Sequence, residues 1–74
     1  MPNVMITGTT RGLGKTLAEF YVEQGWQVYG LARSESTIQS SNYHHRIVDI
    51  SDWNSVDTVI SEIKEIDMLI NNSS

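Results

Sequence analysis

Three glycines lie close together between a short apolar run and an amphipathic stretch near the beginning of the sequence. The run Val4-Met5-Ile6 is typical of a buried parallel strand, predicted over residues 3–7. After it, Gly8 allows a sharp turn, Gly12 leaves room for a pyrophosphate beside the backbone, and Gly14 lets the next helix pack close to the strand. The first amides of that helix would then face an anion. The glycines therefore predict a phosphate-binding loop, with a turn that binds nothing as the alternative.

Apolar residues at helical spacing predict two amphipathic helices, one over residues 13–24 and one from Ser51 or Asp52 to about Lys64. The residues expected on the buried faces are Leu13, Leu17, Phe20 and Tyr21 in the first helix, and Val56, Val59, Ile60 and Ile63 in the second. Further strands are predicted over residues 27–32, 45–50 and 66–70. Strands and helices thus alternate along the chain.

This alternation predicts an α/β protein with a four-stranded parallel sheet. Right-handed crossovers place the strands in the order third, second, first, fourth, with helices on both faces of the sheet. Such an arrangement is half of a doubly wound sheet plus the first strand beyond its switch point. A ligand crevice is expected at the carboxyl ends of the first and fourth strands, where Gly8 and Asn71 lie.

Composition narrows the classes of function. The 74 residues predict a single small domain, residues 1–74. Nine acidic residues against five basic ones give a net charge of −4, which argues against nucleic acid or an anionic membrane as a partner. The absence of cysteine excludes disulfides, thiolate metal sites and cysteine nucleophiles. No apolar run approaches the ~18 residues of a membrane span, and no signal peptide is recognised, so a cytoplasmic protein is predicted.

The stretch Thr7-Gly-Thr-Thr-Arg-Gly-Leu-Gly14 resembles the cofactor motif of the short-chain dehydrogenases/reductases. Its spacing differs from the Gly-x-Gly-x-x-Gly of the commonest dinucleotide fingerprint. Segments 31–34, 48–51 and 66–72 resemble the end of that family's second strand, its adenine-pocket segment, and its fourth strand with an Asn-Asn-Ala-Gly motif. The resemblance covers essentially the whole chain but only the first part of a family member. It implies a truncated Rossmann-type domain that binds a nicotinamide dinucleotide.

The resemblance and the charges together favour NADP(H) over NAD(H). NAD-preferring relatives carry an acid at the end of the second strand, where this chain has Ala32, followed by Arg33. Arg33 and Arg11 would offer charge-assisted hydrogen bonds to a 2′-phosphate, each worth ~1.5–3 kcal/mol. The alternatives are a solvated loop residue for Arg33 and a surface residue paired with an acid for Arg11.

The resemblance also implies roles for residues farther along the chain. Asp49 would accept a hydrogen bond from the adenine amino group, or would instead cap the following helix. Ile50 would supply a backbone contact, and Asn71 would lie on the ribose side and brace the sheet. The complete set of predicted cofactor-binding residues is Gly8, Thr10, Arg11, Gly12, Leu13, Gly14, Arg33, Asp49, Ile50 and Asn71.

Other polar and aromatic residues are interpreted as structural. His44 and His45 predict a solvated turn and no metal site, because neighbours on an extended chain point to opposite sides. Trp26 and Trp53 are predicted to pack in the core. Family catalysis uses a serine and a tyrosine with a lysine four positions later, and none of the three tyrosines here is followed by such a lysine. No catalytic residue is therefore predicted, and Ser73 stands where the family motif has alanine.

Three hypotheses of function remain. The first is a truncated family member that binds NADP(H) and is inactive alone. The second is a non-enzymatic module that has lost cofactor binding and associates with itself or a partner. The third is one half of a split oxidoreductase whose other polypeptide supplies the catalytic residues. An exposed edge at residues 66–70 predicts a homo-oligomer in any of these cases.

Overall fold

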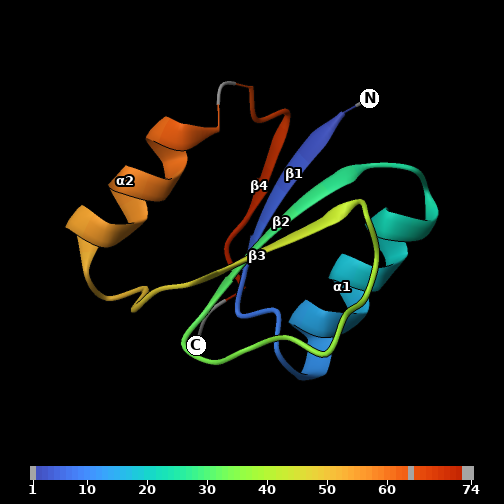
Figure 1. Cartoon of the computed structure of the whole chain (residues 1–74), viewed down its shortest axis with the longest axis horizontal. Helices are drawn as coiled ribbons and strands as arrows, with labels where there is room; N and C mark the ends of the chain where they lie inside the picture. The colour runs from blue at the N-terminus through green and yellow to red at the C-terminus, as the bar shows by residue number, and fades with distance from the viewer. Residues whose placement is uncertain (1, 64, 73–74) are drawn as a thin grey trace.

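The apolar run after Asn3 forms an inner strand of a parallel sheet. The computed structural model describes residues 2–63 and 65–72. The strands are β1 (Asn3–Thr7), β2 (Gln27–Ala32), β3 (Tyr43–Ile47) and β4 (Met68–Ile70), and the helices are α1 (Gly12–Glu23) and α2 (Trp53–Glu62). The strands are parallel and lie in the order β3-β2-β1-β4 (Figure 1). The predicted α/β class and strand order are confirmed.

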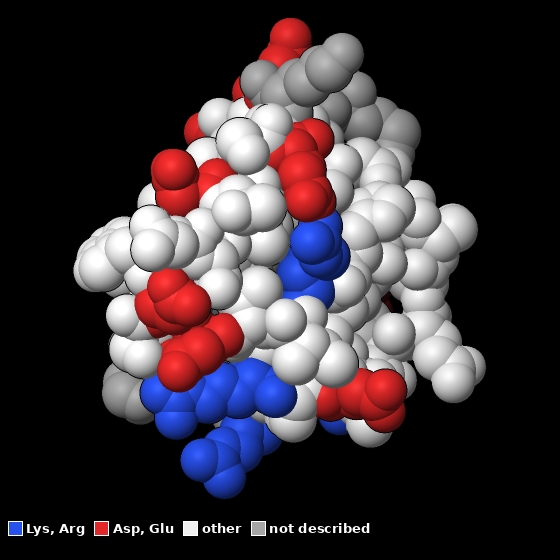
Figure 2. Space-filling view, turned by 60° about the vertical axis from the view of Figure 1, so that its left-hand side comes forward, with Lys and Arg blue, Asp and Glu red and all other residues white. Residues whose placement is uncertain are grey.

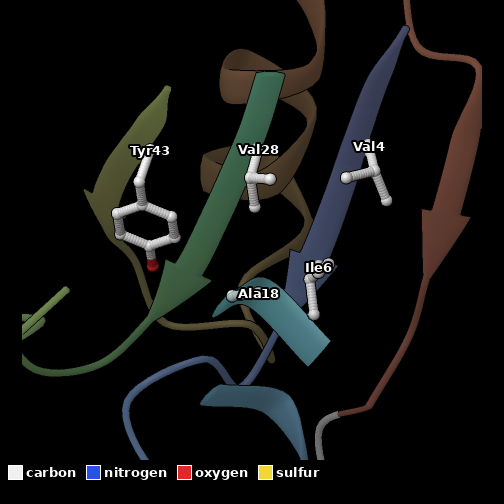
Figure 3. Packing of buried hydrophobic residues seen from close by; sticks show 5 residues of the cluster. All are labelled: Val4, Ile6, Ala18, Val28 and Tyr43. Atoms are coloured by element: carbon white, nitrogen blue, oxygen red, sulfur yellow. The ribbon is translucent and has the colours of Figure 1, made fainter. Parts of the chain in front are cut away.

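The alternating side chains of β1 divide the core into two layers. Val4 and Ile6 pack with Ala18 of α1 on one face of the sheet, as Figure 3 shows. Met5 packs with Val56 and Val59 of α2 on the other face. All three β1 side chains are buried because a helix covers each face, which explains why the strand is continuously apolar. Helices therefore cover both faces, as predicted.

The buried face of α1 differs from the prediction. Leu17 and Tyr21 pack against the core, but Leu13 is 64% exposed and Phe20 is 52% exposed. Ala18 is fully buried instead. The side of α1 that packs against the sheet therefore carries this small side chain, while the larger Leu13 and Phe20 remain exposed.

The second helix begins as predicted. Asp52 is its N-cap, and Oδ1 of this residue accepts a hydrogen bond from the Asn54 amide at 3.1 Å. Val56 and Val59 are buried, as expected from their spacing. The predicted end at Lys64 lies outside the described residues. Neither helix in the described part of the chain is long and apolar enough to cross a bilayer.

Trp26 packs against the core, whereas the predicted packing of Trp53 is wrong. Trp53 is 77% exposed at the beginning of α2. The last turn of α2 is tied to β3 by an ion pair between Glu62 and Arg46. This contact lowers the pKa of the Glu62 carboxyl.

The strand bounds differ from the predicted ones at two places. β3 spans residues 43–47 rather than 45–50, and β4 begins at Met68 rather than at residue 66. The parallel register pairs Ala32, the last residue of β2, with Ile47, so β3 has no strand partner beyond that point. His44 and His45 consequently lie within a strand, and the predicted turn is wrong.

Candidate functional site

The loop between β1 and α1 turns at two left-handed glycines. Gly8 has φ 73° and Gly12 has φ 61°, a conformation that strains residues with a side chain. Arg11, the N-cap of α1, is extended and makes no side-chain capping bond. The first backbone hydrogen bond of the helix runs from the Lys15 amide to the Arg11 carbonyl. The N–H groups before Lys15 therefore have no acceptor within the helix. The loop therefore presents N–H groups and the positive end of a helix dipole.

At Gly14, α1 lies close against the residues that follow β1 and β4. A Cβ at this position would lie 1.9 Å from the Gly8 carbonyl oxygen and 2.6 Å from Nδ2 of Asn72. The side-chain Nδ2 of Asn72 also donates to the Gly8 carbonyl oxygen at 3.4 Å. The predicted reason for this glycine, close packing of helix on strand, agrees with the geometry.

The end of β4 is braced against the end of β1. Thr7 donates from Oγ1 to Oδ1 of Asn71 at 3.0 Å, and the backbone N–H of Asn72 donates to the same Thr7 oxygen at 2.9 Å. Asn71 thus has the bracing contact expected of it. These hydrogen bonds hold the carboxyl ends of β1 and β4 side by side, next to the glycine loop.

An open cleft of about 890 Å³ lies at these strand ends, within the usual size range of ligand pockets. Its lining residues are Gly8, Thr10, Arg11, Gly12, Leu13, Ala32, Arg33, Ser34, Ile50, Ser51 and Asn72. Of the predicted site residues, Gly14, Asp49 and Asn71 are not among the lining residues. Sequence reasoning did not assign Ser34, Ser51 or Asn72 to the site, although each directly follows a residue that it did assign.

Two arginines give the cleft a positive character. Figure 2 shows one group of basic side chains at the lower end of this face and another near its middle, each next to acidic side chains. Within the described part of the chain, Arg11 makes no ion pair, while Nη2 of Arg33 lies 3.2 Å from Oδ1 of Asp49. Both members of that pair are largely exposed, so the contact contributes little stability.

The carboxylate of Asp49 is held by hydrogen bonds from Ser51, two residues later in the chain. Its Oδ1 accepts from the hydroxyl of Ser51 at 2.6 Å and from the Ser51 amide at 3.0 Å. These bonds, with a smaller contribution from Arg33, hold the pKa of the Asp49 carboxyl below its usual value. Asp52 caps α2, so the alternative that Asp49 is the helix cap is wrong. Among the described residues, no three His, Cys, Asp or Glu side chains form a group that could hold a metal ion.

The parallel sheet, the glycine turn into α1 and the cleft at the strand ends define a class: α/β proteins that bind ligands at a switch point of the sheet. The sequence model of the short chain dehydrogenase family matches residues 2–74. The chain belongs to the short-chain dehydrogenase/reductase family and corresponds to its N-terminal part.

Individual relatives agree with this assignment. The chain is 30% identical over 79 residues to the 3-oxoacyl-[acyl-carrier-protein] reductase FabG of Escherichia coli (strain K12), covering 93% of this chain and 32% of FabG. A crystal structure of a short chain dehydrogenase family protein from Francisella tularensis superposes with a TM-score of 0.88 at 22% identity, covering 100% of this chain and 31% of that one. A Leptospira borgpetersenii short chain dehydrogenase with bound NAD+ gives a TM-score of 0.84 at 24% identity, covering 95% and 30%. The chain spans about a third of these relatives.

Proposed function

We propose that this chain is the NADP(H)-binding portion of a short-chain dehydrogenase/reductase-like oxidoreductase. The observation that carries the proposal is the lining of the cleft, which combines the amides at the start of α1 with Arg11 and Arg33. Family membership supports a nicotinamide dinucleotide as the class of ligand. A Cβ at Gly12 would have no atom within 4 Å, so the backbone there is open to a ligand.

Each part of NADP(H) has a candidate partner in this site. The glycine loop and the first turn of α1 would hold the pyrophosphate. Arg33 and Arg11 would bind the 2′-phosphate, and Ala32 offers no carboxylate to repel it. Arg33 would exchange its exposed contact with Asp49 for the phosphate, which leaves Asp49 available for the adenine amino group. Ile50 would contact the adenine side and Asn71 the ribose side.

The proposal includes inactivity of this chain on its own. A bound nicotinamide dinucleotide would supply hydride transfer, while the residues in this chain bind and orient it. Within the described residues, the cleft lining contains neither a tyrosine nor a lysine that could transfer a proton to a carbonyl oxygen. A cytoplasmic location belongs to the same proposal, and fractionation of cells that express a tagged chain would test it.

Calorimetric titration of the chain with NADPH and NADH tests the cofactor assignment. Arg33→Ala is expected to weaken NADPH binding about tenfold or more while changing NADH binding little, because a charge-assisted bond to the 2′-phosphate contributes ~1.5–3 kcal/mol. Arg11→Ala should act in the same direction. Arg46→Ala is the matched control, since Arg46 pairs with Glu62 outside the cleft. An unchanged ratio of NADPH to NADH affinity in both cleft variants would overturn the NADP(H) assignment.

A second candidate function is self-association through the edge of the sheet. β4 lies at this edge, and its Leu69 is 58% exposed. Exposed apolar edge strands favour pairing with another chain. Size-exclusion chromatography with light scattering is expected to give a mass above that of the 8.3 kDa chain, and Leu69→Lys to lower it. A clean monomer at every concentration rejects this candidate, and a stable oligomer that binds no dinucleotide favours it over the first.

A further inference from the structure

Three hydrogen bonds in series connect two of the segments that line the cleft, the glycine loop and the residues that follow β2. Thr9 Oγ1 lies 2.8 Å from the Tyr43 hydroxyl oxygen, which lies 2.7 Å from Nδ1 of His45. Nε2 of His45 lies 2.7 Å from the carbonyl oxygen of Ser34. Thr9 belongs to the glycine loop, and Ser34 directly follows Arg33 at the end of β2. This series, called the Tyr43–His45 bridge below, therefore joins the two segments that carry the arginines of the cleft.

The chemistry of the groups fixes the direction of each bond when the His45 ring is neutral. The Ser34 carbonyl only accepts, so Nε2 of His45 carries the hydrogen and Nδ1 is an acceptor. The Tyr43 hydroxyl then donates to Nδ1, and its oxygen accepts from the hydroxyl of Thr9. Every member of the bridge thus has a partner of the right kind.

The middle of the bridge is buried. Thr9 is fully buried and Tyr43 is 8% exposed, with its ring in the core beside Val28 and its hydroxyl toward the carboxyl end of β2 (Figure 3). Burial raises the pKa of the Tyr43 hydroxyl, so the group stays protonated and keeps its hydrogen to donate. An unpaired hydroxyl at this depth would cost free energy, which makes the bonds of the bridge difficult to break singly.

The sheet leaves room for this bridge at one glycine. A Cβ on Gly30, in the interior of β2, would lie 2.0 Å from the Tyr43 hydroxyl oxygen and 2.6 Å from Oγ1 of Thr9. Glycine weakens a strand interior, so its presence there fits a position where another group approaches the backbone closely. Residues 9, 30 and 43 therefore interlock as one unit.

We propose that Tyr43 and His45 are positioning residues that set the separation of the glycine loop and the end of β2, and thereby aim Arg11 and Arg33 at one dinucleotide. Neither residue lines the cleft, so both act through the backbones that they hold. The inference rests on the proposed function and adds residues that determine its cofactor preference.

The first test uses the chain without any ligand. Backbone ¹⁵N relaxation is expected to show that Tyr43→Phe lowers the order parameters of residues 9–12 and 33–35 together, from the ~0.85 of rigid backbone toward 0.6. Tyr29→Phe is the matched control, because it removes a phenolic hydroxyl on the adjacent strand that has no part in the bridge. If the order parameters of both segments stay unchanged in a folded Tyr43→Phe chain, the proposal is overturned.

The second test is rescue at His45, read by titration with NADPH and NADH. His45→Ala should weaken NADPH binding about tenfold and lower the ratio of NADPH to NADH affinity. His45→Gln should stay within about threefold of the original chain, because an amide offers the same pair of acceptor and donor. His44→Ala, at the neighbouring position of β3, is the control and should change neither value.

The outcomes separate this inference from the proposed function. If the unmodified chain binds neither dinucleotide, the proposed function fails, and the bridge stands or falls on the order parameters alone. If the chain binds NADPH and His45→Ala leaves both affinities unchanged, the proposed function stands and the positioning role is rejected. Equal losses in His45→Ala and His45→Gln also reject it, since they would indicate a need for the ring itself.

Discussion

Replacing Gly14 by alanine is expected to abolish dinucleotide binding and to lower the free energy of unfolding by about 3 kcal/mol, at the upper end of the overpacking range. The new Cβ would lie 1.9 Å from the Gly8 carbonyl oxygen, a backbone atom that moves only if β1 or α1 moves. Gly14 has no positive φ, so alanine suits its conformation and would even favour the helix. The loss of stability would therefore arise from the collision alone. The collision would push α1 away from the glycine loop, and dinucleotide binding would be lost with it.

Gly25→Ala is the matched control for this variant. Gly25 has φ 86° and open space around its Cβ position, so alanine there adds backbone strain without a collision. It should cost about 1–2 kcal/mol and leave binding intact, because it lies at the far end of α1. Urea unfolding followed by tryptophan fluorescence measures the stability, and calorimetry with NADPH measures binding. A Gly14→Ala chain that is as stable as the original and binds as well would contradict the expected result.

Gly30→Ala is expected to have the second largest effect, a loss of about 2–3 kcal/mol in the free energy of unfolding. Its Cβ would collide with the Tyr43 hydroxyl oxygen at 2.0 Å and with Oγ1 of Thr9 at 2.6 Å. Both atoms belong to buried side chains, and protein interiors are close-packed, so a shift of either side chain is costly. Repacking would break the Thr9–Tyr43 bond and leave buried hydroxyls without partners.

A double-mutant cycle checks the cause of that loss. Tyr43→Phe removes the closest of the colliding atoms, so the chain with both Gly30→Ala and Tyr43→Phe should lose about 1 kcal/mol less than the sum of the single losses. Chemical denaturation of the four chains gives the coupling. Strict additivity would show that the methyl group of alanine is accommodated without displacing Tyr43.

The arrangement of the sheet follows from features that are local in the sequence. The apolar run of β1, the glycines after it and the N-cap at Asp52 each act within a few residues, and short right-handed connections leave few ways to order four parallel strands. For this reason the strand order, both helices and most of the cleft lining were predictable. The preference for NADP(H) stays a prediction, because it depends on a phosphate that meets Arg33 and Arg11 in the cleft.

Features that depend on packing partners were not predictable in the same way. Periodicity predicts Leu13 and Phe20 in the core, but the structure buries Ala18 against the sheet and leaves both of them exposed. The local sequence pattern cannot show where β3 ends, because β3 ends where its partner β2 ends. The contact between Arg33 and Asp49 joins residues that sequence reasoning had assigned to different parts of the ligand.

The sequence alone determines the glycine loop and the turn from β1 into α1. Eight consecutive residues, 7–14, are sufficient, because backbone conformation and helix capping are local properties. The Tyr43–His45 bridge has no such local signature. Thr9 and Tyr43 are 34 residues apart, and they meet above Gly30 only when β2 and β3 pair in their observed register. Long-range side-chain bonds of this kind arise from the assembled sheet, because no short segment contains both partners.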